Sequence, residues 1–198
     1  LFGGDLIAFS AALARRIQQM GDGNWALTED DSKEYVRETY LYPPPERGLL
    51  SDTERQNLLR VAVLQSVELA APSEIIRAEG LPRSLRCGLI HSTEHGPEKY
   101  RRYILVHPGF ARLLLAAADS PVDVKETYRE VALRSPFSAM VLSYRLELRG
   151  ELSTAARILQ SIAEEPERLS SAILAGGFHW TAIKCMRFER VGVSSQDM

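Results

Sequence analysis

Apolar residues recur every three or four positions through most of this chain, which predicts helices that each bury one face. The first such stretch covers residues 6–20 and ends at the sequence GDGN, a helix-breaking run. Its apolar positions are Leu6, Phe9, Leu13 and Ile17. The second stretch, TEDDSKEYVRETYLY, opens with acidic residues that suit a helix N-terminus. It stops at residues 43–45, three prolines, because proline lacks the amide donor and disfavours helix in the residue before it. We interpret the prolines as a linker.

From Ser51 the pattern changes to three short helices followed by two strands. The predicted helices begin with the sequences SDTERQNLLRVAVLQSVEL, SEIIRAEG and PRSLR, and Gly80 is expected to end the second one. The predicted strands are LIH at 89–91 and YRRYILV at 100–106, with the polar turn TEHGPEK between them. Helix, helix, helix, strand, turn, strand is the order of a winged helix. The alternative is an unrelated small α+β unit.

Beyond residue 120 every pattern is helical, and Gly150 divides the clearest stretch into an antiparallel helical hairpin. The apolar face expected before Gly150 is Phe137, Met140, Val141, Tyr144 and Leu148; the one after it is Leu152, Ala155, Ala156, Leu159 and Ala163. Residues 171–188 predict one more helix, weakened at Gly176 and Gly177. A single hairpin buries little apolar surface, so we expect it to stack on neighbouring helices.

The predicted fold is therefore mainly α with a small β-hairpin. We expect a helical domain at 1–48, a winged helix at 49–118, and an antiparallel helical-hairpin, tetratricopeptide-like repeat segment at 119–198.

Composition narrows the function classes. The 198 residues are 45% hydrophobic and 25% charged, and the net charge of −2 gives no overall attraction to nucleic acid or anionic membrane. Only Cys87 and Cys185 are present, a sparse usage typical of a reducing compartment, so we expect a cytoplasmic protein. There is no signal-peptide pattern and no apolar run of about 18 residues. The first residue, Leu1, is not a methionine, which suggests a fragment of a larger protein or a processed chain.

Motifs for catalysis are missing from the sequence. It contains no phosphate-binding loop, no G-x-G-x-x-G, no H-E-x-x-H and no C-x-x-C, so no complete enzyme site is expected within this chain. His91 and His95 lie four apart, but in a predicted turn with no cysteine or carboxylate placed to complete a zinc site. We therefore predict no metal and no cofactor within the chain.

A basic set falls in the predicted winged helix, where cations on the third helix and the wing would meet DNA phosphates. Glutamates interleave with it, which favours a solvated face of mixed charge over a DNA surface. The basic residues are Arg77, Arg83, Arg86, Lys99, Arg101 and Arg102, and the acidic ones Glu74, Glu79, Glu94 and Glu98.

His107 stands where the second predicted strand, ending ILV, passes through His-Pro-Gly into the helical run FARLLLAAA. One interpretation is a half-buried histidine satisfied by the backbone. The other is a donor aimed at a bound anion from a rigid strand-to-helix junction, because an imidazole donates to phosphate and titrates near neutral pH.

ILVHPGFARLLLAAA resembles the histidine motif that ends the winged helix of STAND signalling ATPases, which include the NACHT and NB-ARC proteins and their bacterial relatives. Val106-His107-Pro108 matches a bacterial variant of the motif, and RCGLIH resembles the strand before the wing. GGDLIAFSAALARRI resembles the start of the family's helical domain, although Asp5 stands where the family usually has proline. LSYRLELRGELSTAARILQSIAEEPE resembles one tetratricopeptide-type repeat.

The resemblance implies that His107 contacts the β-phosphate of ADP bound to a nucleotide-binding core elsewhere in a parent protein. The winged helix would then be a lid that senses ADP or ATP, and the repeat a sensor for a protein or other ligand; oligomerisation would belong to the parent protein. Two other hypotheses stay open. One is a winged-helix DNA-binding regulator, and the other is a helical adaptor that binds only proteins and in which His107 is structural.

Overall fold

The computed structural model describes residues 28–43, 50–76, 78–92, 101–107, 109–119, 122–163 and 167. The predicted helix at 6–20 and the helix at 171–188 lie outside these residues. The described part is mainly helical with a small three-stranded antiparallel sheet, which confirms the predicted mainly α class. The elements are α2 (Glu29–Val36), a π-helical turn η1 (Arg37–Leu41), α3 (Asp52–Ser66), β1 (Ala71–Pro72), a 3-10 turn η3 (Ala78–Gly80), α4 (Pro82–Arg86), β2 (Ile90–Ser92), β3 (Arg102–Leu105), α5 (Phe110–Ala117), α6 (Val124–Arg134), α7 (Pro136–Leu148) and α8 (Leu152–Ala163).

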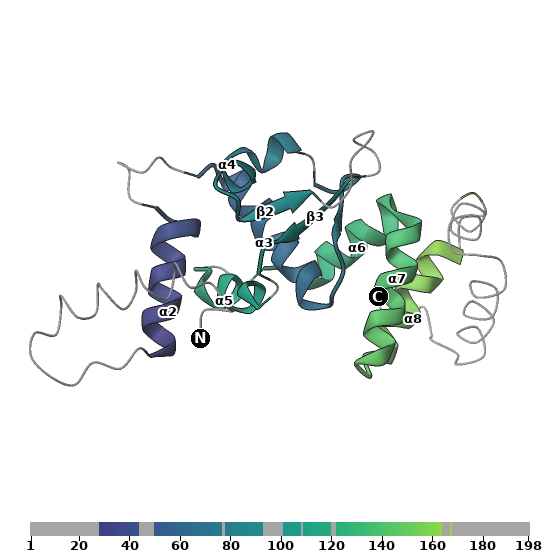
Figure 1. Cartoon of the computed structure of the whole chain (residues 1–198). Helices are drawn as coiled ribbons and strands as arrows, with labels where there is room; N and C mark the ends of the chain where they lie inside the picture. The colour runs from purple at the N-terminus through teal and green to yellow at the C-terminus, as the bar shows by residue number, and fades with distance from the viewer. Residues whose placement is uncertain are drawn as a thin grey trace, which may run out of the picture.

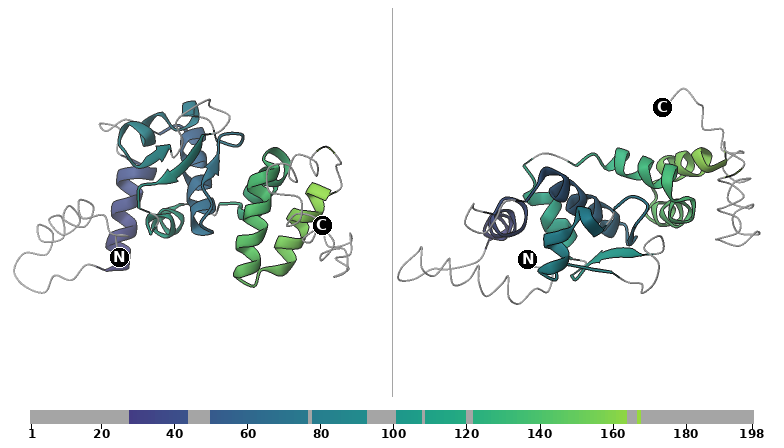
Figure 2. Two further views of the ribbon diagram at one scale, coloured as in Figure 1. Left: turned by 45° about the vertical axis from the view of Figure 1, so that its right-hand side comes forward. Right: turned by 90° about the horizontal axis from the view of Figure 1, so that it is seen from above.

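The elements form two groups side by side (Figures 1 and 2). In one group α3 is central, with α5 and α2 on one side and the sheet and α4 on the other; in the second group α6, α7 and α8 pack together. Helix α3 contacts α6, and the apolar core continues from Val36 in the first group to Ile162 in the second. This single core includes residues on both sides of the predicted domain boundary at 118/119. The predicted domain boundaries stay predictions.

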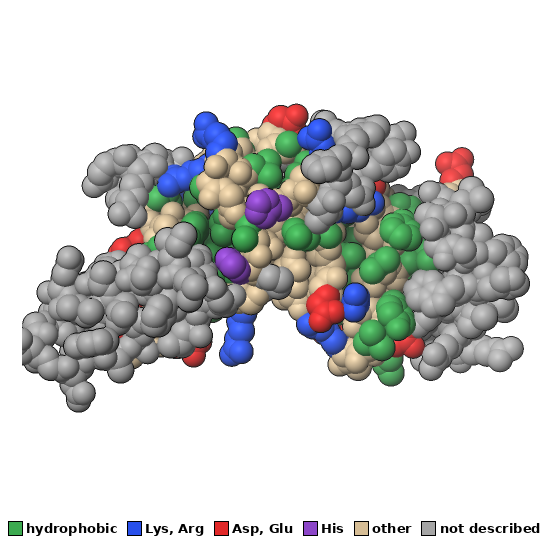
Figure 3. All heavy atoms as spheres, viewed as in Figure 1, with side chains coloured by type: hydrophobic (Ala, Val, Ile, Leu, Met, Phe, Trp, Pro, Cys, Tyr) green, Lys and Arg blue, Asp and Glu red, His purple; other side chains and the backbone are tan. Residues whose placement is uncertain are grey.

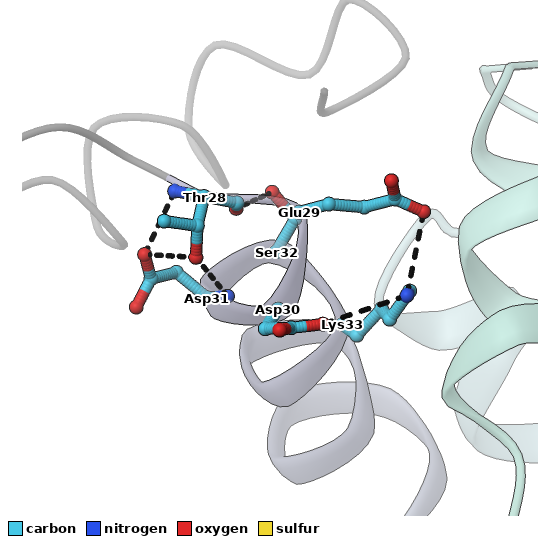
Figure 4. Close-up of polar contacts among 6 residues, drawn as sticks. All are labelled: Thr28, Glu29, Asp30, Asp31, Ser32 and Lys33. Atoms are coloured by element: carbon cyan, nitrogen blue, oxygen red, sulfur yellow. Dashed lines mark hydrogen bonds and ion pairs between the residues drawn. The ribbon is translucent and has the colours of Figure 1, made fainter.

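Helix α2 begins where the acidic residues predicted it to (Figure 4). The Thr28 hydroxyl accepts from the Asp31 backbone N–H at 3.2 Å, and the Asp31 carboxylate accepts from the Thr28 N–H at 2.8 Å. This reciprocal capping box satisfies two amides that a helix start leaves without partners. Lys33 reaches back to Glu29 at 3.4 Å and to Asp30 at 3.5 Å.

The sheet has the order β1-β3-β2, so β3, the last of its three strands in sequence, lies in the middle. Ile90 pairs with Leu105 and both are buried, whereas His91 pairs with Ile104 on the opposite face. Alternation of side chains along each strand therefore turns one face toward α3 and the other toward solvent. The hairpin of β2 and β3 confirms the two predicted strands, and β1 adds a third strand that the sequence did not predict.

The second helix predicted in this region, 73–80, is wrong. Pro72 pairs with Arg102 in the sheet, and the Ser73 N–H donates to the Arg101 carbonyl at 3.1 Å. After this pairing the chain makes only a turn at 73–76 and then the short η3. Gly80 is the last residue of the short η3 and not the end of the predicted longer helix. A Cβ there would lie 2.2 Å from Asn57 Nδ2, which donates to the Gly80 carbonyl at 3.2 Å.

The predicted hairpin of α7 and α8 is present, and Gly150 makes the turn. Its φ of 79° is left-handed, its N–H donates to the Glu147 carbonyl at 2.9 Å, and the Glu151 N–H donates to the Leu146 carbonyl at 2.9 Å. These two bonds form a Schellman motif, which glycine enters without steric cost.

The apolar face predicted for α7 is largely wrong. Phe137, Tyr144 and Leu148 are exposed, whereas α7 buries residues on its other side. The reason is that α6 as well as α8 packs against α7. The buried positions are Ser138, Ala139, Met140, Leu142, Ser143 and Leu146. On α8, Ala155, Ala156 and Leu159 are buried as predicted, and Leu152 is exposed.

Candidate functional site

His107 lies at the junction between β3 and α5, as the sequence predicted. On its strand side Leu105 is fully buried, and the Val106 N–H donates to the Leu89 carbonyl at 3.0 Å. On its helix side Phe110 is 1% exposed, and the Phe110 N–H donates to the His107 carbonyl at 2.8 Å. The backbone of His107 is thus held between two buried anchors.

The imidazole of His107 is half-buried and has no hydrogen bond or ion pair with any residue that the structure describes. Gly109, at the N-cap of α5, supplies no side-chain cap. A helix start without a side-chain cap presents backbone N–H donors and a partial positive charge. The imidazole of His107, which precedes Phe110 by three residues, is a further hydrogen-bond donor in the same junction. This arrangement can bind an anion, with phosphate oxygens as matching acceptors.

The segment before the prolines packs at the same junction. The Tyr40 ring meets the Phe110 ring edge-on, with centroids 5.2 Å apart, and the Tyr35 ring lies 6.4 Å from that of Tyr40. Edge-to-face aromatic pairs are a favoured geometry and contribute about 0.5–1.5 kcal/mol beyond the area that they bury. The first residue of α5, and with it the place of His107, is therefore set by η1 as well as by the sheet.

Of the other histidines, only His91 lies among the residues that the structure describes. His91 is exposed on β2, and His95 lies outside the described residues. Figure 3 shows histidine side chains at the surface over β2 and toward α5, among hydrophobic side chains. Among the residues with a described placement, no group of three or more histidines, cysteines and acids could hold a metal ion.

The predicted basic set is divided by the fold. Arg83 and Arg86 lie on α4, whereas Arg102 on β3 pairs with Glu74 at 3.4 Å and donates to the Arg101 carbonyl at 3.0 Å. Arg77 and Lys99 lie outside the described residues. The pairing with Glu74 confirms that acidic residues offset part of the basic charge here.

A polar cluster that the sequence did not predict ties η1 to the start of the α5–α6 connection. Arg37 donates to both carboxylate oxygens of Asp119, at 2.9 and 3.0 Å, and the Asp119 N–H donates to the Tyr42 hydroxyl at 3.2 Å. The guanidinium groups of Arg37 and Arg55 lie 5.3 and 4.5 Å from the centre of the Tyr42 ring. No periodic pattern links residues so distant in sequence, and only the fold brings them together.

The hydrogen bonds between Arg37 and Asp119 stabilise the charged forms of both groups. They raise the pKa of Arg37 and, with help from the charge of Arg55, lower the pKa of Asp119 below its ordinary value. Both side chains are about half exposed, so salt screens this pair.

A second polar cluster joins α3 and the residues directly after it to α6 and α7. Arg145 on α7 pairs with Glu68 at 2.8 Å, Arg149 donates to the Ser66 carbonyl, and Arg60 on α3 pairs with Glu130 on α6 at 3.1 Å. Glu68 has a φ of 59°, the one left-handed residue other than glycine in the described part of the chain. Left-handed backbone is strained for a residue with a Cβ, so the conformation of Glu68 lowers the stability of the fold by about 1–2 kcal/mol.

No protein-family model, no curated protein and no solved structure matches this chain. In the described part of the chain, no helix combines the length and the apolar composition needed to cross a bilayer.

Proposed function

We propose that this chain is a non-catalytic regulatory segment of a STAND-type signalling ATPase. In this proposal residues 49–118 form a winged-helix lid that senses the nucleotide state of a core elsewhere in the parent protein. His107 is the sensing residue and donates to the β-phosphate of ADP. The helices after residue 118 are the start of a tetratricopeptide-like sensor. The chain itself holds no cofactor, and ADP or ATP binds the parent protein.

The observation that carries the proposal is the position of the His107 imidazole. It is half-buried at a start of α5 without a side-chain cap, and no residue in the described ranges accepts from it. A histidine with a purely structural role at such a junction would be expected to donate to a neighbouring carbonyl or carboxylate. A phosphate oxygen would complete its hydrogen bonding and also meet the positive end of α5.

The order of elements supports the winged-helix part. A long helix, the two-residue strand β1, two short helical segments and a strand pair follow one another from α3 to β3. The wing would be the connection between β2 and β3. A DNA-binding role fits less well. Helix α4 has five residues, a rise of about 7.5 Å, so it offers few positions to a DNA groove. Its cations are Arg83 and Arg86, and Arg102 is already paired.

The two polar clusters support the proposal of a lid whose position depends on the helices that it contacts. One joins η1 to the connection after α5, and the other joins α3 to α6 and α7. The Arg37–Asp119 and Arg145–Glu68 pairs are substantially exposed and therefore individually weak, so they can exchange partners as the groups move. A ligand of the repeat helices could in this way bias the lid, provided that its affinity differs between the two lid positions. We accordingly propose that the surface of the repeat helices binds a protein partner or the parent's own core.

The proposal also assigns the chain to the cytoplasm. Cys87 is an exposed free thiol, a state that a reducing compartment preserves.

The test is nucleotide binding by the parent protein, core included, measured by calorimetry with ADP and ATP. We expect His107→Ala to weaken ADP binding about tenfold or more, since a hydrogen bond to a charged group contributes about 1.5–3 kcal/mol. ATP binding should change less. His91→Ala is the matched control, because His91 is also a histidine of this unit but lies on the exposed face of β2.

Equal ADP affinities of the wild type and His107→Ala, with both proteins folded by circular dichroism, would make His107 structural. The helical adaptor would then be the better description. A parent gene that encodes no nucleotide-binding core before Leu1 would overturn the proposal without any binding experiment.

A further inference from the structure

The chain leaves α3 through a backbone conformation that suits glycine, yet the residue there is Glu68. Helix α3 ends at Ser66. The Leu69 N–H donates to the Leu64 carbonyl at 2.9 Å, and the Glu68 N–H donates to the Gln65 carbonyl at 3.0 Å. These two bonds form a Schellman motif, which places the residue after the C-cap, here Glu68, in left-handed backbone. Glycine is the usual residue at this position because it has no Cβ, so Glu68 carries a strain that glycine would remove.

The side chain of Glu68 gives a physical reason for that strain. Its carboxylate pairs with Arg145 of α7 at 2.8 Å, and Arg149 of the same region donates to the Ser66 carbonyl. Residues four apart lie on one side of a helix, so one side of α7 holds the end of α3 at two points. Cations at this place also meet the negative end of the α3 dipole. Glycine in place of Glu68 would remove the first of the two contacts.

These contacts join the two groups of elements. Glu68 follows α3 in the group that contains the sheet, whereas Arg145 lies on α7 in the group of α6, α7 and α8 (Figure 1). A further pair between the groups, Arg60 on α3 with Glu130 on α6, has side chains that are 29% and 16% exposed. The side chains of Arg145 and Glu68 are 37% and 68% exposed. Of the two pairs, Arg145 with Glu68 is therefore the one that water and salt weaken more easily.

We propose that Glu68 is a conformational latch between the two groups. In the latched state its left-handed backbone presents the carboxylate to Arg145. When the pair breaks, Glu68 returns to a relaxed backbone and α7 shifts away from the end of α3, about the contact that α3 makes with α6. Backbone strain favours the open state and the ion pair favours the latched one, so both states are populated. This inference concerns the movement of the two groups and does not depend on nucleotide sensing.

The distance between two spin labels measures the latch in the full chain. In a Cys185→Ser background, one label is attached to the exposed Cys87 of the sheet group and the other to Arg157→Cys, an exposed position on α8. Glu68→Gln removes the charge and keeps the strain. We expect it to raise the fraction of molecules outside the main distance peak about two- to fivefold, which is the range for loss of an exposed ion pair.

Salt gives a second readout that needs no substitution at the latch. At about 1 M salt the screening length falls to about 3 Å, so the labelled protein with native Glu68 should show the same rise. Glu68→Gln should show no further rise with salt, because the pair is already absent.

Two variants separate the charge from the strain. Glu126→Gln is the matched control, since Glu126 pairs with Arg129 at 3.5 Å within α6 alone, and it should leave the distances unchanged. Glu68→Gly removes charge and strain together. Its distance distribution should therefore change less than that of Glu68→Gln, and it should unfold at a higher urea concentration than Glu68→Gln.

The latch is refuted if Glu68→Gln leaves the distance distribution unchanged, or if Glu126→Gln changes it as much. The part assigned to strain is refuted if Glu68→Gly matches Glu68→Gln in its distances or unfolds at no higher urea concentration. Arg145→Gln together with Glu68→Gln should change the distances no more than either substitution alone. An additive change would mean that the two side chains act independently, and would also overturn the proposal.

Discussion

The N-terminus of α4 is capped from another helix, and removing that cap is a sharp test of how the sheet unit is held together. Helix α4 has no side-chain cap of its own at Leu81. Instead the Glu54 carboxylate on α3 accepts from the Arg83 N–H at 2.7 Å and from the Ser84 N–H at 3.0 Å. Glu54 is 5% exposed, so water does not readily replace these bonds. The carboxylate does the work of a local cap across 29 positions of sequence.

Glu54→Ala leaves both amides without an acceptor and opens a space beside them. A hydrogen bond to a charged group contributes about 1.5–3 kcal/mol, and each buried donor left unsatisfied costs about 1–3 kcal/mol. The Arg83 amide is only partly buried and can be hydrated. We therefore expect Glu54→Ala to lower the free energy of unfolding by about 2–4 kcal/mol.

Glu54→Gln is the matched variant, because its amide oxygen can still accept from the two N–H groups. It loses only the negative charge at the positive end of α4, worth about 0.3–1 kcal/mol. Urea unfolding followed by circular dichroism at 222 nm measures both variants, and the midpoint should shift without a change in slope. The capping argument is wrong if Glu54→Ala costs less than about 1 kcal/mol, or if Gln costs as much as Ala.

Two further changes test the α7–α8 hairpin and the polar cluster of Arg37 and Asp119. Gly150→Ala places a Cβ on left-handed backbone, and nothing lies within 4 Å of that Cβ, so the cost should be conformational alone. We expect the free energy of unfolding in urea to fall by about 1–2 kcal/mol. A fall of more than about 3 kcal/mol would indicate a steric clash and contradict this reasoning. The lowered pKa of Asp119 means that its bond to Arg37 stabilises the fold above about pH 4 and that this contribution is lost as the pH falls through the folded-state value. Stability profiles of the wild type and Asp119→Asn should therefore converge below about pH 4, and parallel profiles down to pH 2 would contradict the pairing.

Local signals in the sequence predicted the helices and strands that depend on nearby residues. The capping box at Thr28, the strands around Ile90 and Leu105 and the turn at Gly150 all follow from short-range rules. Each is a property of a few consecutive residues, so no knowledge of the fold was needed. The position of His107 at a strand-to-helix junction was predictable for the same reason.

Predictions failed where one surface had two candidate partners. Helix α7 carries apolar residues all round, and periodicity alone could not tell which side α6 and α8 would cover. Residues 73–80 have the composition of a helix start, but Pro72 pairs with Arg102 in the sheet and the Ser73 N–H donates to the Arg101 carbonyl just before β3. In both cases a tertiary contact competed with a local preference and prevailed.

The sequence by itself determined the mainly helical class of this protein, its two strands around Ile90 and Leu105, and the place of His107 at a strand-to-helix junction. These depend on hydrophobic period, capping residues and backbone limits, which act over a few residues. The tertiary structure decided the cap of α4 by Glu54, the clamp of Arg37 on Asp119 and the exposed side of α7. These depend on which surfaces meet when distant segments collapse onto one core, a choice made by the summed burial of the whole chain and not by any local pattern.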